Sequence, residues 1–191
     1  MMIETLLREL ADEHIEYDWA RPTEYQRAGD LRVTSEVVFS CPNPPEFSPC
    51  GDVPPGSHPV HVGFLRRQDR ETGEEVTDVS LVFVPLAAPE VIAEAEFEDA
   101  IEDWQPLGPD LAFLWDSAAM DVLPEGFEDH VTAELAVPGP DGRGRAWADF
   151  LVEPATGLNV LAFPVSSESA TCLAGRSADG TLVALLMVAE V

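Results

Sequence analysis

The pattern of apolar and polar positions is clearest in the last third of the chain. Two short apolar runs, 159–165 and 170–176, are followed by residues 181–188, in which every position after Thr181 is apolar. Asp179 and Gly180 lie before the last run, and Asp-Gly between apolar runs is a strong hairpin signal because glycine accepts positive φ. An unbroken apolar run of this length is typical of a strand buried on both faces. We therefore expect a C-terminal meander of three strands, with the last one central in the sheet.

A helical period marks the N-terminus. Within residues 2–15, apolar side chains recur at three- and four-residue spacing and charged side chains take the opposite side; the apolar set is Ile3, Leu6, Leu7 and Leu10. This amphipathic helix is expected to pack on the sheet, although a terminal helix could instead bind a partner. Residues 16–30 show no clear period and are expected to form a covering loop.

The middle of the chain alternates short apolar segments with turns. Strands are expected at 31–40 (one strand or a pair), 60–65, 76–86 and 111–115, and short helices at 117–122, 125–136 and 145–152. The segments 60–65 and 76–86 read as a hairpin. In 91–104, alanine and phenylalanine alternate with glutamate, which favours a strand by its period and a helix by its propensities.

Residues 41–59 form the clearest loop, because seven of these residues are proline. Proline lacks the N–H that a central strand donates and fixes φ. Since no boundary splits the chain, we expect one domain over residues 1–191. Residues 1–30 would form the N-terminal helix and covering loop, and 31–191 the β-rich core. The fold class is α+β: a mostly antiparallel β-sheet, either a sandwich or a strongly curved sheet, with a few short helices and the N-terminal amphipathic helix.

The charge changes the functional picture. The chain has 36 acidic side chains against 10 arginines, with no lysine, and its formal net charge is −26. Nucleic acid and anionic membranes both attract basic surfaces, so neither is expected as a partner. Three explanations of the acidity stay open: high solubility or salt adaptation, a docking face for a basic protein, and divalent cations.

The location follows from what the sequence lacks. Its N-terminus shows no basic segment followed by an apolar core, and no apolar run approaches the roughly 20 residues that span a bilayer. Cys41, Cys50 and Cys172 form an odd set without a close Cys-x-x-Cys pair. We expect a cytoplasmic protein with reduced thiols.

Catalytic and metal-binding motifs are weak. Cys41, Cys50, His58 and His61 are zinc-ligand types, but structural zinc sites use cysteine pairs closer in sequence. The chain has no Gly-x-Ser-x-Gly motif and no glycine-rich phosphate loop in the required context. No metal and no cofactor is therefore predicted, and a non-enzymatic role is favoured while catalysis stays open.

The C-terminal segments also carry a resemblance. Residues 159–163 and 172–188, together with the blocks 31–44 and 53–60, resemble an uncharacterised bacterial domain-of-unknown-function family marked by a C-terminal Gly-Asp-Gly motif before the penultimate strand. The resemblance covers about residues 31–191 and favours a strand for 91–104. Ser166, Ser167 and Glu168 stand where the family has its motif. It implies a tight turn presenting one carboxylate, here that of Glu168, and these three residues are the candidate binding residues.

Two functions of different classes remain. We favour a non-enzymatic module that binds a basic protein, with an immunity- or antitoxin-like role as one version. The alternative is a small hydrolase or ligand-binding enzyme with a site near the 41–59 loop and the 166–169 turn. The sequence gives no oligomeric state.

Overall fold

The structure is a computed structural model that describes residues 2–41, 48–69, 72–101, 105–107 and 110–190. Its helices are α1 (Ile3–His14), α2 (Pro89–Ile92) and α3 (Phe127–Leu135), with the 3-10 helices η1 (Asp18–Ala20) and η2 (Ser117–Val122). Its strands are β1 (Glu24–Val33), β2 (Val37–Ser40), β3 (Gly56–Gln68), β4 (Glu75–Pro85), β5 (Glu96–Asp99), β6 (Gln105–Pro106), β7 (Asp110–Asp116), β8 (Ala148–Glu153), β9 (Leu158–Val165), β10 (Ser169–Arg176) and β11 (Leu182–Glu190).

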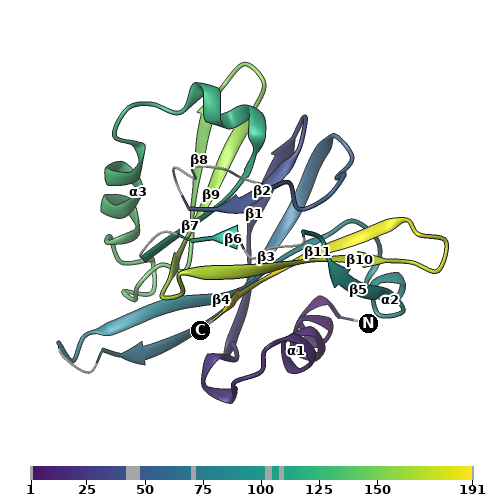
Figure 1. Cartoon of the computed structure of the whole chain (residues 1–191). Helices are drawn as coiled ribbons and strands as arrows, with labels where there is room; N and C mark the ends of the chain where they lie inside the picture. Colours follow the sequence, from purple (N-terminus) through teal and green to yellow (C-terminus); the bar gives the residue numbers. More distant parts are fainter. Residues whose placement is uncertain (1, 42–47, 70–71, 102–104, 108–109, 191) are drawn as a thin grey trace.

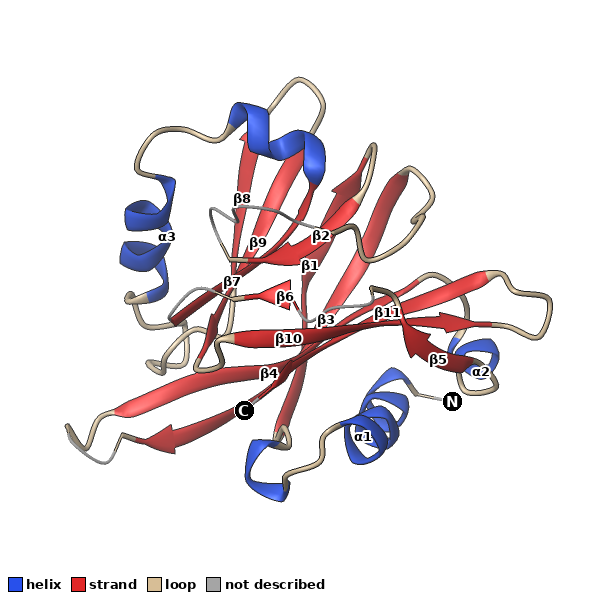
Figure 2. Cartoon of the chain, viewed as in Figure 1, coloured by secondary structure: helices blue, strands red, loops and turns tan. Residues whose placement is uncertain are grey.

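The strands form two antiparallel sheets (Figures 1 and 2). The large sheet has the order β1-β3-β4-β11-β10-β5, with β6 pairing to β10, and the small sheet has the order β2-β7-β9-β8. Over the described residues both sheets are open. This arrangement confirms the α+β fold class with a mostly antiparallel sheet and few short helices.

Apolar side chains fill three layers of contact. Between the sheets lie Phe39, Phe64, Phe163, Leu185 and Met187, all buried. Helix α1 covers the outer face of the large sheet through Leu6, Leu7 and Leu10, which join a cluster with Phe83 and Leu186. Helices η2 and α3 cover the outer face of the small sheet through Ala119, Phe127 and Val131, which pack with Phe113 and Trp115. Both sheets are therefore covered on their outer faces.

The continuous apolar run of β11 is explained by its place between two covered faces. Leu186 pairs with Phe83 of β4 on one side and with Leu173 of β10 on the other. Leu185 and Met187 face the core between the sheets, whereas Leu186 and Val188 join the α1 cluster. The expected central C-terminal strand is confirmed.

The N-terminal helix is confirmed and packs on its own chain, but the expected covering loop over 16–30 is wrong from Glu24 onward. There β1 begins and pairs with β3. A register shift between Arg27 and Gly29 interrupts the alternation of buried and exposed residues. Because of this bulge, the apolar residues of β1 do not recur at every second position, and the strand is not recognisable from the sequence.

The three C-terminal strands do not form one meander. Strand β9 pairs with β7 and β8 in the small sheet, whereas β10 and β11 pair with each other in the large sheet. The chain crosses between the sheets in the turn from Val165 to Ser169. An apolar run predicts a buried strand but does not specify which sheet receives it.

Residues 145–152 are the clearest error, because β8 forms there and not a helix. Ala148 pairs with Ala162 and Phe150 with Val160 of β9. Leu151 is 61% exposed, so the apolar residues of this segment lie on both faces of an edge strand. Pairing with β9 outweighs the helix propensities of alanine and leucine.

The remaining elements agree with expectation, except at the end of the predicted 41–59 loop. The 31–40 pair, the hairpin, the 111–115 strand and the helices over 117–122 and 125–136 all form. In 91–104 the strand prediction is confirmed for Glu96–Asp99, after a helical turn, and 102–104 lie outside the described residues. Residues 48–55 contain no helix or strand, and 42–47 of the same expected loop are not described. The loop prediction is wrong for 56–59, which begin β3 and pair with β1, Pro59 opposite Asp30. The pairing of β3 with β4 begins only at His61, so Pro59 lies where β3 has a partner strand on one side. No helix in the described ranges has the length and apolar character to cross a membrane.

Candidate functional site

The end of the β3–β4 hairpin next to its turn carries a polar cluster on each face. Leu65 pairs with Asp78, and Arg66 pairs with Thr77. Because successive side chains of a strand point to opposite faces, Arg66 and Thr77 lie on one face and Leu65 and Asp78 on the other.

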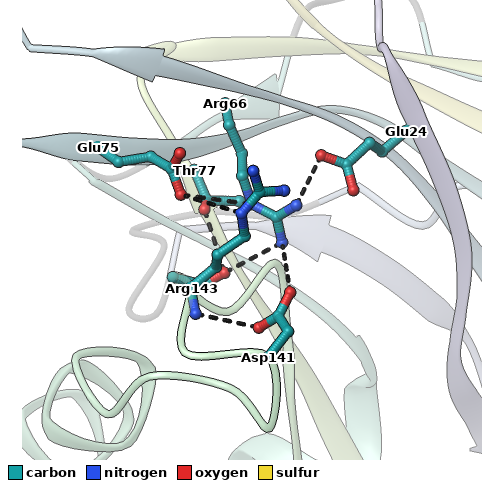
Figure 3. Close-up of polar contacts among 7 residues, drawn as sticks. Glu24, Arg66, Glu75, Thr77, Asp141 and Arg143 are labelled. Atoms are coloured by element: carbon teal, nitrogen blue, oxygen red, sulfur yellow. Dashed lines mark hydrogen bonds and ion pairs between the residues drawn. The ribbon is translucent and has the colours of Figure 1, made fainter.

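Arg66 is the centre of the first cluster (Figure 3). Its side chain is 10% exposed, and its Nη1 lies 2.6 Å from Oε1 of Glu24. Two more carboxylates lie farther away, Asp141 at 3.8 Å and Glu75 at 3.9 Å. The guanidinium also lies 5.0 Å from the ring centroid of Phe64. Three carboxylates thus surround one nearly buried cation.

This cluster fastens the 138–145 loop to the hairpin (Figure 3). The hydroxyl of Thr77 donates to the carbonyl oxygen of Gly144 at 3.2 Å, and Arg143 lies 3.9 Å from Glu75. A Cβ at position 144 would come within 2.8 Å of Oγ1 of Thr77. Since carboxylates of the chain already surround the positive charge, we assign this cluster a structural role, not an anion-binding one.

The second cluster joins Asp78 to the turn between β9 and β10. The Ser166 N–H donates to Oδ1 of Asp78 at 2.9 Å, and the Ser166 hydroxyl donates to Oδ2. Arg67 donates to Oγ of Ser166 at 2.7 Å and lies 3.2 Å from Oδ2 of Asp78. The pairing of β11 with β4 ends at Val188 and Leu81. Asp78 lies beyond the end of this pairing, where it anchors the turn between β9 and β10.

A β-bulge lies next to this cluster. Gly63 pairs with Leu81 and Phe64 with Val79, which leaves Ser80 as the extra residue of β4. Its Oγ is buried and has no hydrogen-bond partner among the described residues. A cavity of about 10 Å³, lined by Trp19, Asp78, Ser80, Ser166 and Ser167 among others, lies here. Such a volume suits about one water molecule and excludes an organic substrate.

The three predicted binding residues take different roles in the turn. Ser166 contacts Asp78 and Arg67, whereas Ser167 is buried and donates to the carbonyl oxygen of Ser169 at 2.7 Å. Glu168 has an exposed side chain, and its carbonyl oxygen accepts the Leu107 N–H at 2.9 Å. Their role in binding stays a prediction.

The structure adds residues that the sequence reading missed. Asp78 lies 88 positions before Ser166, and no local motif marks either Asp78 or Arg67. Ser80 could be suspected as a polar residue within an apolar strand. Trp19 stands out in the sequence as an aromatic residue within a polar stretch, but its exposure is known only from the structure.

Large apolar side chains are exposed around η1. Tyr17 is 48% exposed, Trp19 is 57% exposed, and their ring centroids are 5.8 Å apart. On the Trp19 side lies an open hollow of about 760 Å³, lined by Leu65, Arg67 and Val76 among others. On the Tyr17 side lies a second hollow of about 470 Å³, whose walls include His14, Ile15, Glu16, Leu173 and Val188. We name Tyr17, Trp19, Leu65, Arg67 and Val76 the Trp19 surface.

Carboxylates dominate the surroundings of the Trp19 surface. Exposed acidic side chains follow α1 and η1: Glu9, Asp12, Glu13, Glu16 and Asp18. On the α1 side of the large sheet, the α2 segment adds the exposed Glu90 and Glu94, which flank Ile92 of the α1 cluster (Figure 1). Glu96 and Glu98 of β5 point to the opposite face from Phe97, which packs against that cluster. Eight arginines of the described chain each lie within ion-pair distance of a carboxylate: Arg8, Arg21, Arg27, Arg66, Arg67, Arg143, Arg145 and Arg176. Their positive charge is therefore largely compensated locally, and the surface around η1 is acidic.

The zinc-ligand types seen in the sequence are used separately. The Cys50 sulfur lies 3.3 Å from that of Cys172, and Nε2 of His58 lies 2.7 Å from the carbonyl oxygen of Pro54. His61 is half-buried on β3, and burial lowers its pKa. Within the described ranges, no three histidine, cysteine or acidic side chains are grouped to hold a metal ion.

Comparisons with protein-family models, with curated proteins and with solved structures found no match to this chain.

Proposed function

We propose that the protein is a non-enzymatic binding module whose Trp19 surface docks a basic partner protein. The observation that carries this proposal is the exposed pair of Tyr17 and Trp19 beside two hollows. Tyrosine and tryptophan are enriched among residues that dominate binding energy at protein interfaces. A tryptophan that is 57% exposed leaves a large apolar area in water, and a partner would remove that area from water.

The charge specifies the kind of partner. The net charge is −26, and exposed carboxylates follow α1 and η1 beside the apolar centre. Such a field accelerates association with a basic protein and repels acidic ones. The complementary partner surface has an apolar recess surrounded by lysine or arginine. An immunity- or antitoxin-like protein that covers a basic toxin in the cytoplasm is one concrete form of this role.

The alternative, a small hydrolase or ligand-binding enzyme, has less support. Its best candidate is Ser166, whose hydroxyl contacts a carboxylate and a guanidinium. Serine nucleophiles are ordinarily activated by a neighbouring general base that a third group orients. In addition, the adjoining cavity of about 10 Å³ admits no substrate. The same contacts are explained by anchoring the turn between the two sheets.

The test is affinity capture from the native lysate at low salt, with a matched pair of variants. Trp19→Ala removes the proposed anchor, and Leu151→Ala removes an equally exposed apolar side chain from β8 of the other sheet. We expect the wild type and Leu151→Ala to retain one basic protein that high salt releases, and Trp19→Ala to lose it. Calorimetry with the purified partner should show a dissociation constant raised roughly 10- to 100-fold by Trp19→Ala.

Two results would contradict the proposal. One is a lysate in which no basic protein is enriched by the wild type. The other is a basic protein that binds Trp19→Ala as tightly as the wild type, because the charge would then act without the Trp19 surface.

A further inference from the structure

Cys50 and Cys172 meet inside the protein although 122 positions separate them. Their sulfur atoms are 3.3 Å apart, and the two residues are 0% and 1% exposed. Both are thiols. A disulfide bond measures about 2.05 Å, so the sulfurs need to approach by roughly 1 Å to form one.

The pair bridges the two sheets. The Cys50 N–H donates to the carbonyl oxygen of Val37 at 2.8 Å, which attaches Cys50 to β2 of the small sheet. Cys172 lies within β10 of the large sheet and pairs with Met187 of the central strand β11. Both cysteines belong to the core between the sheets. A bond between them would therefore connect the sheets covalently.

We propose that Cys50 and Cys172 are an oxidation site, at which a disulfide oxidant converts the two thiols into an intramolecular disulfide. Cys172 is held in a strand, whereas Cys50 lies in residues 48–55, which contain no helix or strand. We expect the irregular segment that carries Cys50 to move and bring the two sulfurs together, because it can shift without breaking a ladder of strand hydrogen bonds.

The reaction balances with oxidised glutathione as the oxidant. The Cys50 thiol loses its proton, and its sulfur attacks one glutathione sulfur and releases one glutathione thiolate. The deprotonated Cys172 sulfur then attacks the Cys50 sulfur of the mixed disulfide and releases the second thiolate. Two protein thiols and one glutathione disulfide give one protein disulfide and two glutathione thiols, after the two protons pass to the thiolates.

Burial should make the oxidation of the two thiols slow and the resulting disulfide long-lived. The hydrogen bond with the Cys50 thiol, followed by burial, raises the pKa of Cys172 well above its usual range. Since the thiolate is the attacking species, oxidation waits for the Cys50 segment to open. Once formed, the disulfide is shielded from reductants in the same way.

The experiment equilibrates the purified protein with oxidised glutathione and maps its cysteines by proteolysis and mass spectrometry. We expect a linked pair of peptides carrying Cys50 and Cys172, which reduction with dithiothreitol separates. Because the loop closed by the bond is long, the midpoint of thermal unfolding should rise by roughly 5–15 °C on oxidation.

Three variants separate this site from the remaining cysteine. Cys41→Ser is the matched control and should keep both the linked peptides and the thermal shift. Cys50→Ala and Cys172→Ala should each abolish the shift. The proposal is overturned if all three cysteines remain open to alkylation in denaturant after oxidation. It is overturned equally if the linked peptides contain Cys41, or if the shift persists in Cys50→Ala.

Discussion

The side chain of Asn159, on β9, completes the backbone hydrogen bonding of Arg32, on β1 of the other sheet. Its Oδ1 accepts the Arg32 N–H at 2.9 Å, and its Nδ2 donates to the carbonyl oxygen of Asp30 at 2.8 Å and to Oδ1 of Asp149 at 2.7 Å. The residue is 6% exposed. The side-chain amide thus makes the hydrogen bonds that a neighbouring strand would make, and it connects β1, at the edge of the large sheet, to the small sheet.

Replacing Asn159 should weaken the connection between the sheets. Asn159→Ala leaves two backbone groups of β1 and the Asp149 carboxylate without this partner, and we expect a loss of about 2–4 kcal/mol in the free energy of unfolding. Asn159→Asp keeps the acceptor but loses both donors and places a second carboxylate beside Asp149. It should therefore be less destabilised at pH 4 than at pH 7. Urea unfolding at the two pH values measures both effects, and wild-type stability of Asn159→Asp at pH 7 would refute this account.

Asp116 has a similar task at the start of η2. It is fully buried and accepts from Ser35 N–H at 2.7 Å, from Ala118 N–H at 2.9 Å and from the backbone and hydroxyl of Thr34. Asp116→Ala should cost about 3 kcal/mol of unfolding free energy, because it removes an N-cap and the buried acceptor of several part-buried hydrogen bonds. The matched control is Asp121→Ala, at an exposed position of the same helix, which should change stability by less than about 0.5 kcal/mol. Equal effects of the two variants in chemical denaturation would contradict the cap.

Gly175 and Phe97 form a pair across β10 and β5 that a double-mutant cycle can test. A Cβ on Gly175 would lie 2.8 Å from the Phe97 ring. Gly175→Ala should therefore destabilise the protein by about 1–3 kcal/mol through overpacking. In the Phe97→Ala background the same change should cost much less, since the ring that it meets is gone. Additive losses in thermal unfolding would mean that the ring does not set the cost.

Sequence reasoning predicted the elements better than their connections. The apolar run of β11 specified a central strand because two covered faces impose it, and α1 was visible from its helical period. Strand β8 is not recognisable from the sequence, because apolar residues lie on both of its faces: Ala148 is buried and Leu151 is exposed on the other face. The sequence of this edge strand therefore lacks the alternation of apolar and polar residues. The crossing of the chain between sheets after Val165 depends on pairing partners, which the apolar pattern of β9 does not encode.

The same limit applies to the candidate sites. Ser166 is a candidate because it stands where the resembled family has its Gly-Asp-Gly motif, but its contacts with Asp78 and Arg67 arise from packing across 88 and 99 positions. Cys50 and Cys172 read as ordinary residues because their proximity is a property of the packed sheets. In each case the chemistry depends on register and packing between segments that are distant in the sequence. For the aromatic residues of η1, the sequence shows the residue types, and only their exposure has to come from the structure.

His14, at the end of α1, should make stability depend on pH. Its ring centroid lies 5.4 Å from that of Phe97, its Nε2 is buried, and burial lowers its pKa. The unfolded chain, with an ordinary histidine pKa of about 6.5, binds the proton more readily than the folded protein. The stabilisation from neutral His14 is therefore fully present above that pH and is lost as the pH falls through 6.5 toward the lower folded-state value. His14→Gln removes this titration, while His61 and the many carboxylates titrate in both proteins. We expect the difference in unfolding temperature, wild type minus variant, to decrease between pH 8 and pH 5.5, and parallel profiles over that range would show that His14 is not held neutral by the fold.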